Sequence, residues 1–376
     1  MKPAPAKSPF KREIELDFIR GIAILLVVDF HASRPMLLAP FTALGWKHFG
    51  WTGVDIFFIL SGFLVGGLLV KEWKLRGRID SGQFLIRRSF KIWPQYYFYL
   101  VVMLLTGHRS WHDLWGNFLN IQNYTGGIAH TWSLAVEEHA YLLLVAILAI
   151  AARRHIRMRS VFLFLAALSV CVAVLSLVLA AHHHDVFPTT HTRIDGIFCG
   201  VLLAMLYHYV PDTFHRLQRY IWLWLAIIVA TLLYLRFEPQ SPIAYAFSLN
   251  LADLSGVALL MLLYRHREGA RHSFLYRLVA WIGLYSYGIY LWHVSVVSYG
   301  VSLARHLHLR EDSLWLWMGI RLAGILLGVF FSKMIEFPML KLRDRLFPRR
   351  VDSAVGTPAE IEAEEAPLAA QTSQPI

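Results

Sequence analysis

Cysteine and charge are the two things that this sequence has little of. Only two cysteines occur in 376 residues, and both Cys171 and Cys199 stand in apolar runs. This pattern offers no disulfide framework and no cysteine-based zinc site, and it gives no support to redox chemistry. Asp, Glu, Lys and Arg together make up 16% of the chain, against about 25% in soluble domains. The composition therefore argues against a purely soluble protein.

Long apolar runs fill much of the chain instead. Hydrophobic residues account for 57% of the sequence. A membrane-crossing helix needs about 20 mainly apolar residues, so the chain length suits about ten crossings in one polytopic, all-α transmembrane bundle. The apolar runs predict helices at 15–35, 51–70, 91–107, 132–152, 160–181, 194–210, 220–236, 243–264, 277–301 and 314–336.

The net charge of +11 comes from basic residues that gather in alternate loops. With the N-terminus in the cytoplasm, the inner segments 1–13, 71–91, 153–159, 211–220, 265–277 and 341–350 carry 26 Lys and Arg, and the outer loops carry 7. Basic residues are retained on the cytoplasmic side of a membrane. The asymmetry therefore predicts that both termini are cytoplasmic, and it explains the basic balance without a nucleic-acid partner.

Three parts of the chain are expected. Residues 1–13 form a short cytoplasmic segment that does not resemble a cleavable signal peptide. Residues 14–340 form the transmembrane domain, whose longest outer loop, 108–131, can hold a short interfacial helix. Residues 341–376 form a basic cytoplasmic segment and then an acidic tail, which has too little apolar content to fold and is expected to be disordered.

Ionisable residues inside the predicted spans are candidates for function. A charged side chain near the bilayer centre costs at least about 2.5 kcal/mol, so such residues usually have a role. Arg20 and His31 are eleven residues apart in the first predicted helix, which puts them on one face, about 16 Å apart. This spacing suits a ligand threaded through the bundle, with its anionic part at Arg20 and its reactive part at His31. The alternatives are that Arg20 extends to lipid headgroups and that His31 caps the helix.

A series of ordered motifs extends this interpretation along the chain. They are Arg20 with His31, Gly53–Phe63, Arg87–Pro94, Thr131–Tyr141, Arg193–Asp195, Ser286–His293 and Glu336–Pro338. In this order they resemble the acyltransferase 3 family of polytopic membrane acyltransferases. Lys91 departs from the usual Arg-x-x-Arg pattern, in which a second arginine follows Arg88. There is no room for the extracytoplasmic hydrolase domain that some members carry, so we expect a stand-alone membrane domain.

The resemblance implies an acyl-CoA donor, often acetyl-CoA. Arg88 and Lys91 lie at the predicted cytoplasmic mouth of the bundle, where basic side chains can bind the phosphates of CoA. Arg20 is expected to join them in this acyl-CoA site. The retention of basic residues on the cytoplasmic side is enough to explain Arg87, without a ligand.

Acyl transfer from a thioester to a hydroxyl needs a base for the alcohol proton and stabilisation of the tetrahedral intermediate. His31 is the candidate general base. Glu137 is the candidate carboxylate that orients His31, because it lies at a similar depth, just over one turn inside its helix. Asp29 points elsewhere and is expected to pair with another helix. In an alternative mechanism, His31 or a hydroxyl, such as that of Ser133 or Tyr141, carries the acyl group transiently.

Four residues are candidates for contact with the acceptor at the outer entrance: Trp132, Ser133, Arg193 and His293. Trp132 can stack on a sugar, but tryptophan is also common at membrane interfaces for physical reasons. Arg193 can instead form an ion pair with Asp195 that braces the helix entrance.

Two other features have structural rather than ligand-binding interpretations. The outer-loop histidines His182–His184 and His191 are adjacent residues that rarely converge on a metal, so no metal is expected. The Ser61–Gly62 and Gly66–Gly67 pairs are expected to be close helix contacts, since small residues let membrane helices approach.

The sequence thus predicts a multi-pass plasma (inner) membrane O-acyltransferase. It would move an acyl group, acetyl being the expected one, from cytoplasmic acyl-CoA to a hydroxyl of an extracytoplasmic or membrane-linked glycan or glycosylated small molecule. Partners would be the lipid bilayer, a carbohydrate acceptor and separate glycan-assembly proteins. The alternative is a polytopic transporter that exports a polar solute, since polar groups inside ten spans fit both.

Overall fold

The computed structural model describes residues 13–32, 49–237, 240–264, 273–311 and 313–348. Over these residues the chain is all-α, as predicted, and contains no β-strand. The N-terminal segment 1–13, except for its last residue, and the tail 351–376 that is predicted to be disordered lie outside the described residues.

Helices follow one another along the chain with few long connections. The first half contains α1 (Ile14–His31), η1 (Gly50–Thr52), α4 (Gly53–Ser61), η2 (Gly62–Gly66), α5 (Gly67–Arg76), α6 (Ser81–Leu105), α7 (Trp111–Phe118), α8 (Gln122–Thr125), η3 (Ala129–Thr131), α9 (Trp132–Arg153) and α10 (Met158–Ala181). The second half contains α11 (Thr190–Arg193), α12 (Asp195–Tyr209), α13 (Pro211–Gln218), α14 (Ile221–Arg236), α15 (Pro242–Leu263), α16 (Phe274–Leu284), α17 (Ser286–His306), α18 (Leu314–Phe331), η5 (Ser332–Glu336) and α19 (Phe337–Leu346).

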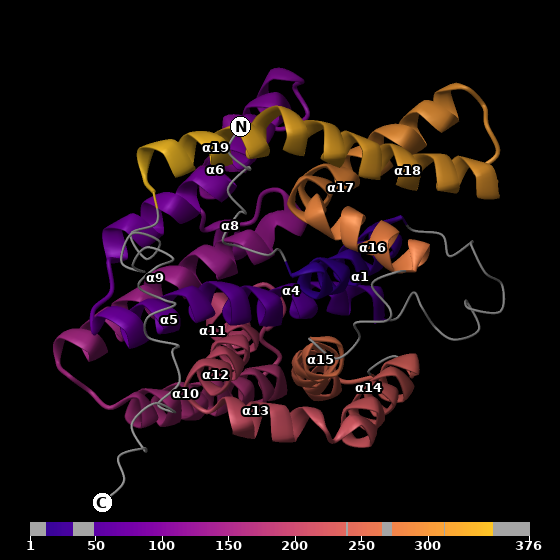
Figure 1. The fold of residues 1–376 in the computed structure, drawn as a ribbon. Coiled ribbons are helices and arrows are strands. Elements are labelled where there is room, and N and C mark those ends of the chain that lie inside the picture. Colours follow the sequence, from indigo (N-terminus) through magenta and orange to yellow (C-terminus); the bar gives the residue numbers. More distant parts are fainter. Residues whose placement is uncertain (1–12, 33–48, 238–239, 265–272, 312, 349–376) are drawn as a thin grey trace, which may run out of the picture.

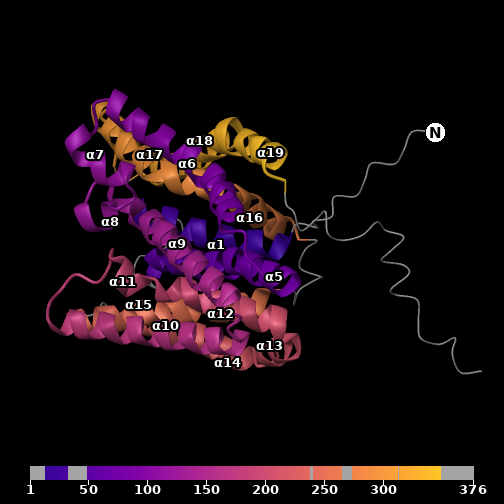
Figure 2. The same ribbon diagram turned by 90° about the vertical axis from the view of Figure 1, so that its left-hand side faces the viewer.

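The polar motifs lie on helices at the centre of the bundle. In Figure 1, α1 and α4 run through the middle, between α16–α18 on one side and α10 with α12–α15 on the other. Helix α1 packs on α4, α16 and α17, and α4 packs on α12 and α15. Figure 2 shows α9 crossing the same central region beneath α6. Asp29 of α1, Asp55 of α4 and Glu137 of α9 are each paired with an arginine from another helix.

Five helical stretches are long and apolar enough to cross a membrane: Gly50–Arg76, Ala129–Arg153, Met158–Ala181, Pro242–Leu263 and Leu314–Leu346. Helices α12 and α13, bent by 117° to each other, make a sixth if they count as one span. The described part of the chain is therefore a multi-pass membrane bundle, while ten crossings and cytoplasmic termini stay predictions.

The structure corrects two of the predicted segments. The inner loop predicted at 71–91 is mostly helical, because α5 continues to Arg76 and α6 already begins at Ser81, where Asp80 accepts a hydrogen bond from the Gln83 N–H at 3.0 Å. The single span predicted at 277–301 is broken at Tyr285, whose backbone angles (φ −100°, ψ 12°) separate α16 from α17. Outside the spans, loop 108–131 contains the predicted short helix, α7.

Helix α4 and its continuation η2 lie against α12 at a glycine contact. A Cβ on Gly62 would overlap the carbonyl oxygen of Ile197, and a Cβ on Gly200 would overlap the carbonyl of Ile59. A Cβ on Gly66 would likewise crowd Val201. The predicted close helix contact at these small residues is confirmed, and it holds Ser61 at the inner face of α4.

Candidate functional site

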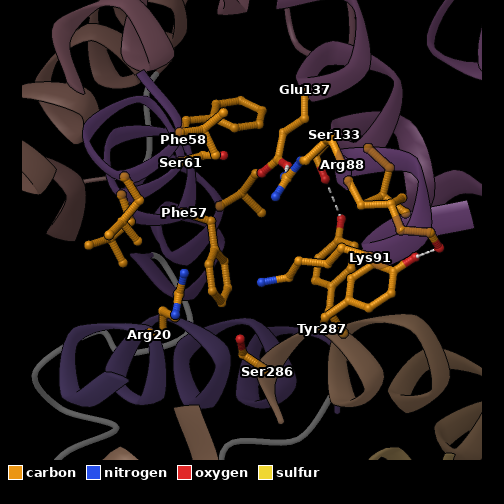
Figure 3. A pocket seen from close by; sticks show the side chains of 17 residues that line it. Arg20, Phe57, Phe58, Ser61, Arg88, Lys91, Ser133, Glu137, Ser286 and Tyr287 are labelled. Carbon is orange, nitrogen blue, oxygen red and sulfur yellow. Dashed lines mark hydrogen bonds and ion pairs between the residues drawn. The ribbon is translucent and has the colours of Figure 1, made fainter. Parts of the chain in front are cut away.

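A cavity lies where α1, α4, α6, α9 and α17 meet. Its lining is drawn in Figure 3. It brings together five of the residues that the sequence singled out, from three separate helices: Arg20, Arg88, Lys91, Ser133 and Glu137.

Arg88 and Glu137 form an ion pair on the wall of this cavity. The Arg88 Nη2 atom lies 3.0 Å from Glu137 Oε2 and also donates to the Tyr141 hydroxyl. Tyr141 donates to Glu137 Oε2 at 2.8 Å and is hydrogen-bonded to Ser61. The guanidinium also stands 4.3 Å from the centre of the Tyr141 ring. The hypothesis from the sequence pairs Glu137 with His31, whereas the structure pairs it with Arg88, because α6 and α9 face each other across the cavity.

Lys91 and Arg20 approach the cavity from two other sides (Figure 3). Arg20 Nη1 lies 3.2 Å from Asp17 Oδ1, one turn earlier on α1. The charged groups on the lining are thus three cationic side chains and the single carboxylate of Glu137. This surplus of positive charge suits an anionic ligand.

Three histidines meet beyond the cavity, at the end of α1. His31 is the last residue of α1, and its Nδ1 lies 3.3 Å from His293 Nε2 on α17. The ring of His130, from η3, lies 5.5 Å from the His293 ring and 6.5 Å from the His31 ring, measured between centroids. The sequence placed His31 and His293 in separate roles, and the structure brings them into contact.

Backbone carbonyls define which nitrogen of each ring carries the proton, because a carbonyl can only accept. His31 Nδ1 lies 2.9 Å from the carbonyl of Val27, and His293 Nδ1 lies 2.7 Å from that of Tyr290. Both Nδ1 atoms are therefore donors. The single Nδ1–H of His31 is therefore shared: the Val27 carbonyl is its nearer acceptor at 2.9 Å and the lone pair of His293 Nε2 its second acceptor at 3.3 Å. The base on His31 is its Nε2 atom.

Tyr290 connects the histidine cluster to the cavity. It lines the cavity and donates to the carbonyl of His130. Its oxygen lies 2.6 Å from Ser133 Oγ, which therefore donates to it. Its ring lies 5.8 Å from that of His293. The cavity and the histidines thus form one continuous polar region along α9 and α17.

Trp132 and Arg193, the other two predicted acceptor contacts, lie in the packed interior. Trp132 is buried against Phe58 and Phe187, with ring centroids 5.9 and 4.8 Å apart. Arg193 is fully buried in an ion pair with Asp55 of α4. The alternative of a bracing ion pair holds for Arg193, although its partner is Asp55 rather than Asp195. The predicted partner for Asp29 exists as well, since Arg321 of α18 lies 2.7 Å from it.

Three residues of the site escaped sequence analysis. His130 stands just before the motif Thr131–Tyr141, and Tyr290 lies within the motif Ser286–His293 but was not assigned a role. Asp55 lies within Gly53–Phe63 and was not assigned a role. Among the described residues, no group of three or more His, Cys, Asp or Glu side chains is arranged to hold a metal ion.

Comparisons with known proteins identify the family of the chain. A family model described as an acyltransferase domain matches residues 13–335. The peptidoglycan O-acetyltransferase OatA of Listeria monocytogenes is 23% identical over 358 residues, which cover 87% of this chain and 55% of OatA. SACOL0978 of Staphylococcus aureus, provisionally named an O-acetyltransferase, is 25% identical over 76% of this chain and 50% of its own.

A third relative is YrhL of Bacillus subtilis, provisionally named a peptidoglycan O-acetyltransferase. It is 24% identical over 75% of this chain and 48% of its own length. The chain thus spans about half the length of these curated relatives. No solved structure matches it. Because the family match runs through nearly all of the described bundle and its cavity, the chain belongs to the acyltransferase 3 family.

Proposed function

We propose that this protein is an O-acyltransferase of the plasma (inner) membrane. It takes an acyl group, acetyl in the first instance, from cytoplasmic acyl-CoA and transfers it to a hydroxyl of an extracytoplasmic or membrane-linked glycan or glycosylated small molecule. The observation that carries the proposal is the continuous polar region from the cationic cavity through Tyr290 to His31. Relatives named as acetyltransferases, one of them acting on peptidoglycan, support acetyl as the group and a carbohydrate as the acceptor.

The donor occupies the cavity with its thioester toward Ser133 and Tyr290. Lys91 and Arg20 attract an anionic donor by their positive charge. The same charge stabilises the oxyanion that forms on the thioester carbonyl. Arg88 is held by Glu137 and Tyr141, so it shapes the wall and contributes to this field without leaving its partners.

His31 Nε2 takes the proton from the acceptor hydroxyl as its oxygen attacks the carbonyl carbon of the thioester. The tetrahedral intermediate collapses with cleavage of the carbon–sulfur bond. The imidazolium of His31 then returns the proton to the CoA thiolate, so that the ester and free CoA leave and His31 is neutral again.

His293 acts as a positioning residue for His31. Its Nε2 accepts from His31 Nδ1, which orients the ring and stabilises the imidazolium during the reaction. This is the role that the sequence-based hypothesis gave to Glu137. Ser133 stays a candidate contact for the acceptor, since its hydroxyl reaches both the cavity and Tyr290.

The first test is acyl transfer by the purified full-length protein with labelled acetyl-CoA and cell-wall glycan fragments. His31→Ala should lower transfer at least about 100-fold, the scale of a lost general base. The exposed His182 provides a matched control, and His182→Ala should transfer normally. Near-normal transfer by His31→Ala would remove His31 from the mechanism.

The same preparation separates the proposal from the transport alternative. Acyl transfer by the intact protein supports the enzyme. A solute flux in proteoliposomes, without any acyl transfer to glycan or small-molecule acceptors, would favour the transporter.

His293 needs a readout of its own. His293→Gln keeps an acceptor oxygen near the position of Nε2, whereas His293→Leu removes it. We expect the glutamine variant to recover a large share of the turnover that the leucine variant loses, at similar thermal stability. Equal turnover in the two variants would contradict the positioning role.

A further inference from the structure

A second cavity lies at the opposite end of α9 from Ser133. It is formed by the end of α5, the start of α6 and the end of α9. Three arginines line it: Arg76, Arg78 and Arg153. The sequence predicts that this end of the bundle faces the cytoplasm.

The two carboxylates on the lining are already engaged. Glu72 Oε1 accepts from the Asp80 N–H at 3.2 Å and lies 3.9 Å from Arg76. Asp80 accepts from the backbone at the start of α6. Arg78 and Arg153 have no ion pair within the described part of the chain. Two guanidinium groups are therefore available to an anion, and each can bind phosphate oxygens in a bidentate manner.

The first cavity has too few free cationic groups for the phosphates of CoA, and the second cavity offers more. Sequence reasoning gave the CoA phosphates to Arg88 and Lys91, but the structure binds Arg88 to Glu137 and Tyr141. That engagement leaves Lys91 and Arg20 on the first lining, beside the reacting thioester, and Arg20 itself lies 3.2 Å from Asp17. The several phosphate charges at the nucleotide end of CoA need cationic partners further from the reaction.

The two cavities are a suitable distance apart along shared helices. From Ser81 to Arg88 on α6 is seven residues, or about 10 Å, and from Glu137 to Arg153 on α9 is sixteen residues, or about 24 Å. The pantetheine arm of CoA has about as many backbone bonds as four amino-acid residues and reaches about 15 Å. The arm therefore covers the distance along α6, and the pyrophosphate and nucleotide that follow it extend CoA further toward Arg153 at the end of α9.

We propose that the nucleotide end of acyl-CoA binds in the second cavity, with its phosphates on Arg78 and Arg153, while the thioester lies in the first. This inference rests on the proposed acyl-CoA donor and adds the site of its phosphates. A phosphate group can also come from an anionic lipid headgroup, so the test must separate the two sources.

The test measures binding of CoA to the full-length protein in neutral detergent by titration calorimetry. Arg78→Ala and Arg153→Ala should each weaken binding roughly tenfold, the scale of one lost charge-assisted contact. Arg154→Ala is the matched control, because Arg154 is the adjacent arginine and does not line the cavity. It should bind CoA within about twofold of the intact protein.

Turnover supplies the second readout. S-acetyl-pantetheine lacks the nucleotide, so the Arg78 and Arg153 variants should use it as well as the intact protein does, while their KM for acetyl-CoA rises. If both variants bind CoA like Arg154→Ala, the site is wrong even though the enzyme is right. If phosphatidylglycerol nanodiscs alone show the difference between variants, the arginines bind lipid and the inference also fails. If the intact protein neither binds CoA nor transfers acetyl from it, the proposed function fails first.

Discussion

Two arginines in this bundle each form an ion pair with a carboxylate from another helix, yet their surroundings differ. Arg193 and Asp55 are 1% and 0% exposed and lie among packed rings, whereas Arg88 and Glu137 are each 15% exposed and line a cavity. Asp195 and Asp253 are also buried near Arg193, so that arginine balances more than one carboxylate. The comparison teaches that a charge in a membrane span marks a site only when open space lies beside it.

The largest effect should come from breaking the fully buried pair. Arg193→Met leaves Asp55 and its neighbouring carboxylates without a cation, which should destabilise the fold by about 3–5 kcal/mol. We expect little monodisperse protein, and a lower melting temperature in what remains, by size-exclusion chromatography with thermal ramping. A well-folded Arg193→Met protein would show that the buried pair is dispensable.

The same substitution at the cavity should separate activity from stability. Arg88→Met should leave the fold closer to intact than Arg193→Met does, because water in the cavity can solvate Glu137, while acetyl transfer falls about 100-fold through loss of charge at the reacting carbonyl. Melting temperature and single-turnover transfer on the same preparation check both halves. A normal transfer rate would place Arg88 with Arg193 as a purely structural residue.

Breaking an exposed ion pair should have the smallest effect on stability and activity. Arg305 and Glu311 lie 2.8 Å apart with side chains 67% and 37% exposed. Surface ion pairs contribute little because water and salt screen them. Arg305→Gln should therefore change neither the melting temperature nor the transfer rate measurably. A clear loss of either would mean that distance between partners, rather than burial, governs these pairs.

Sequence patterns predicted the helices well because each apolar run reports its own length and periodicity. They singled out Arg20, Lys91 and Ser133 but assigned the first two to the donor and Ser133 to the acceptor, whereas the structure puts all three on one cavity. They did not predict that Glu137 would pair with Arg88, since the two residues are on helices whose contact depends on the packing of the whole bundle. His130 was missed for the same reason: nothing local to residues 108–131 indicates that η3 folds back onto α17.

The break between α16 and α17 affects whether the cavity stays polar when its side chains are replaced. Ser286 and Tyr287 open α17 and line the cavity, so a helix begins inside the bundle. The first turn of any helix has backbone N–H groups without intrahelical acceptors, and hydrocarbon cannot satisfy them. Polar groups in the cavity can supply acceptors to the N–H groups that open α17. Replacing a single side chain can abolish acyl transfer, but we expect the cavity to stay polar and hydrated.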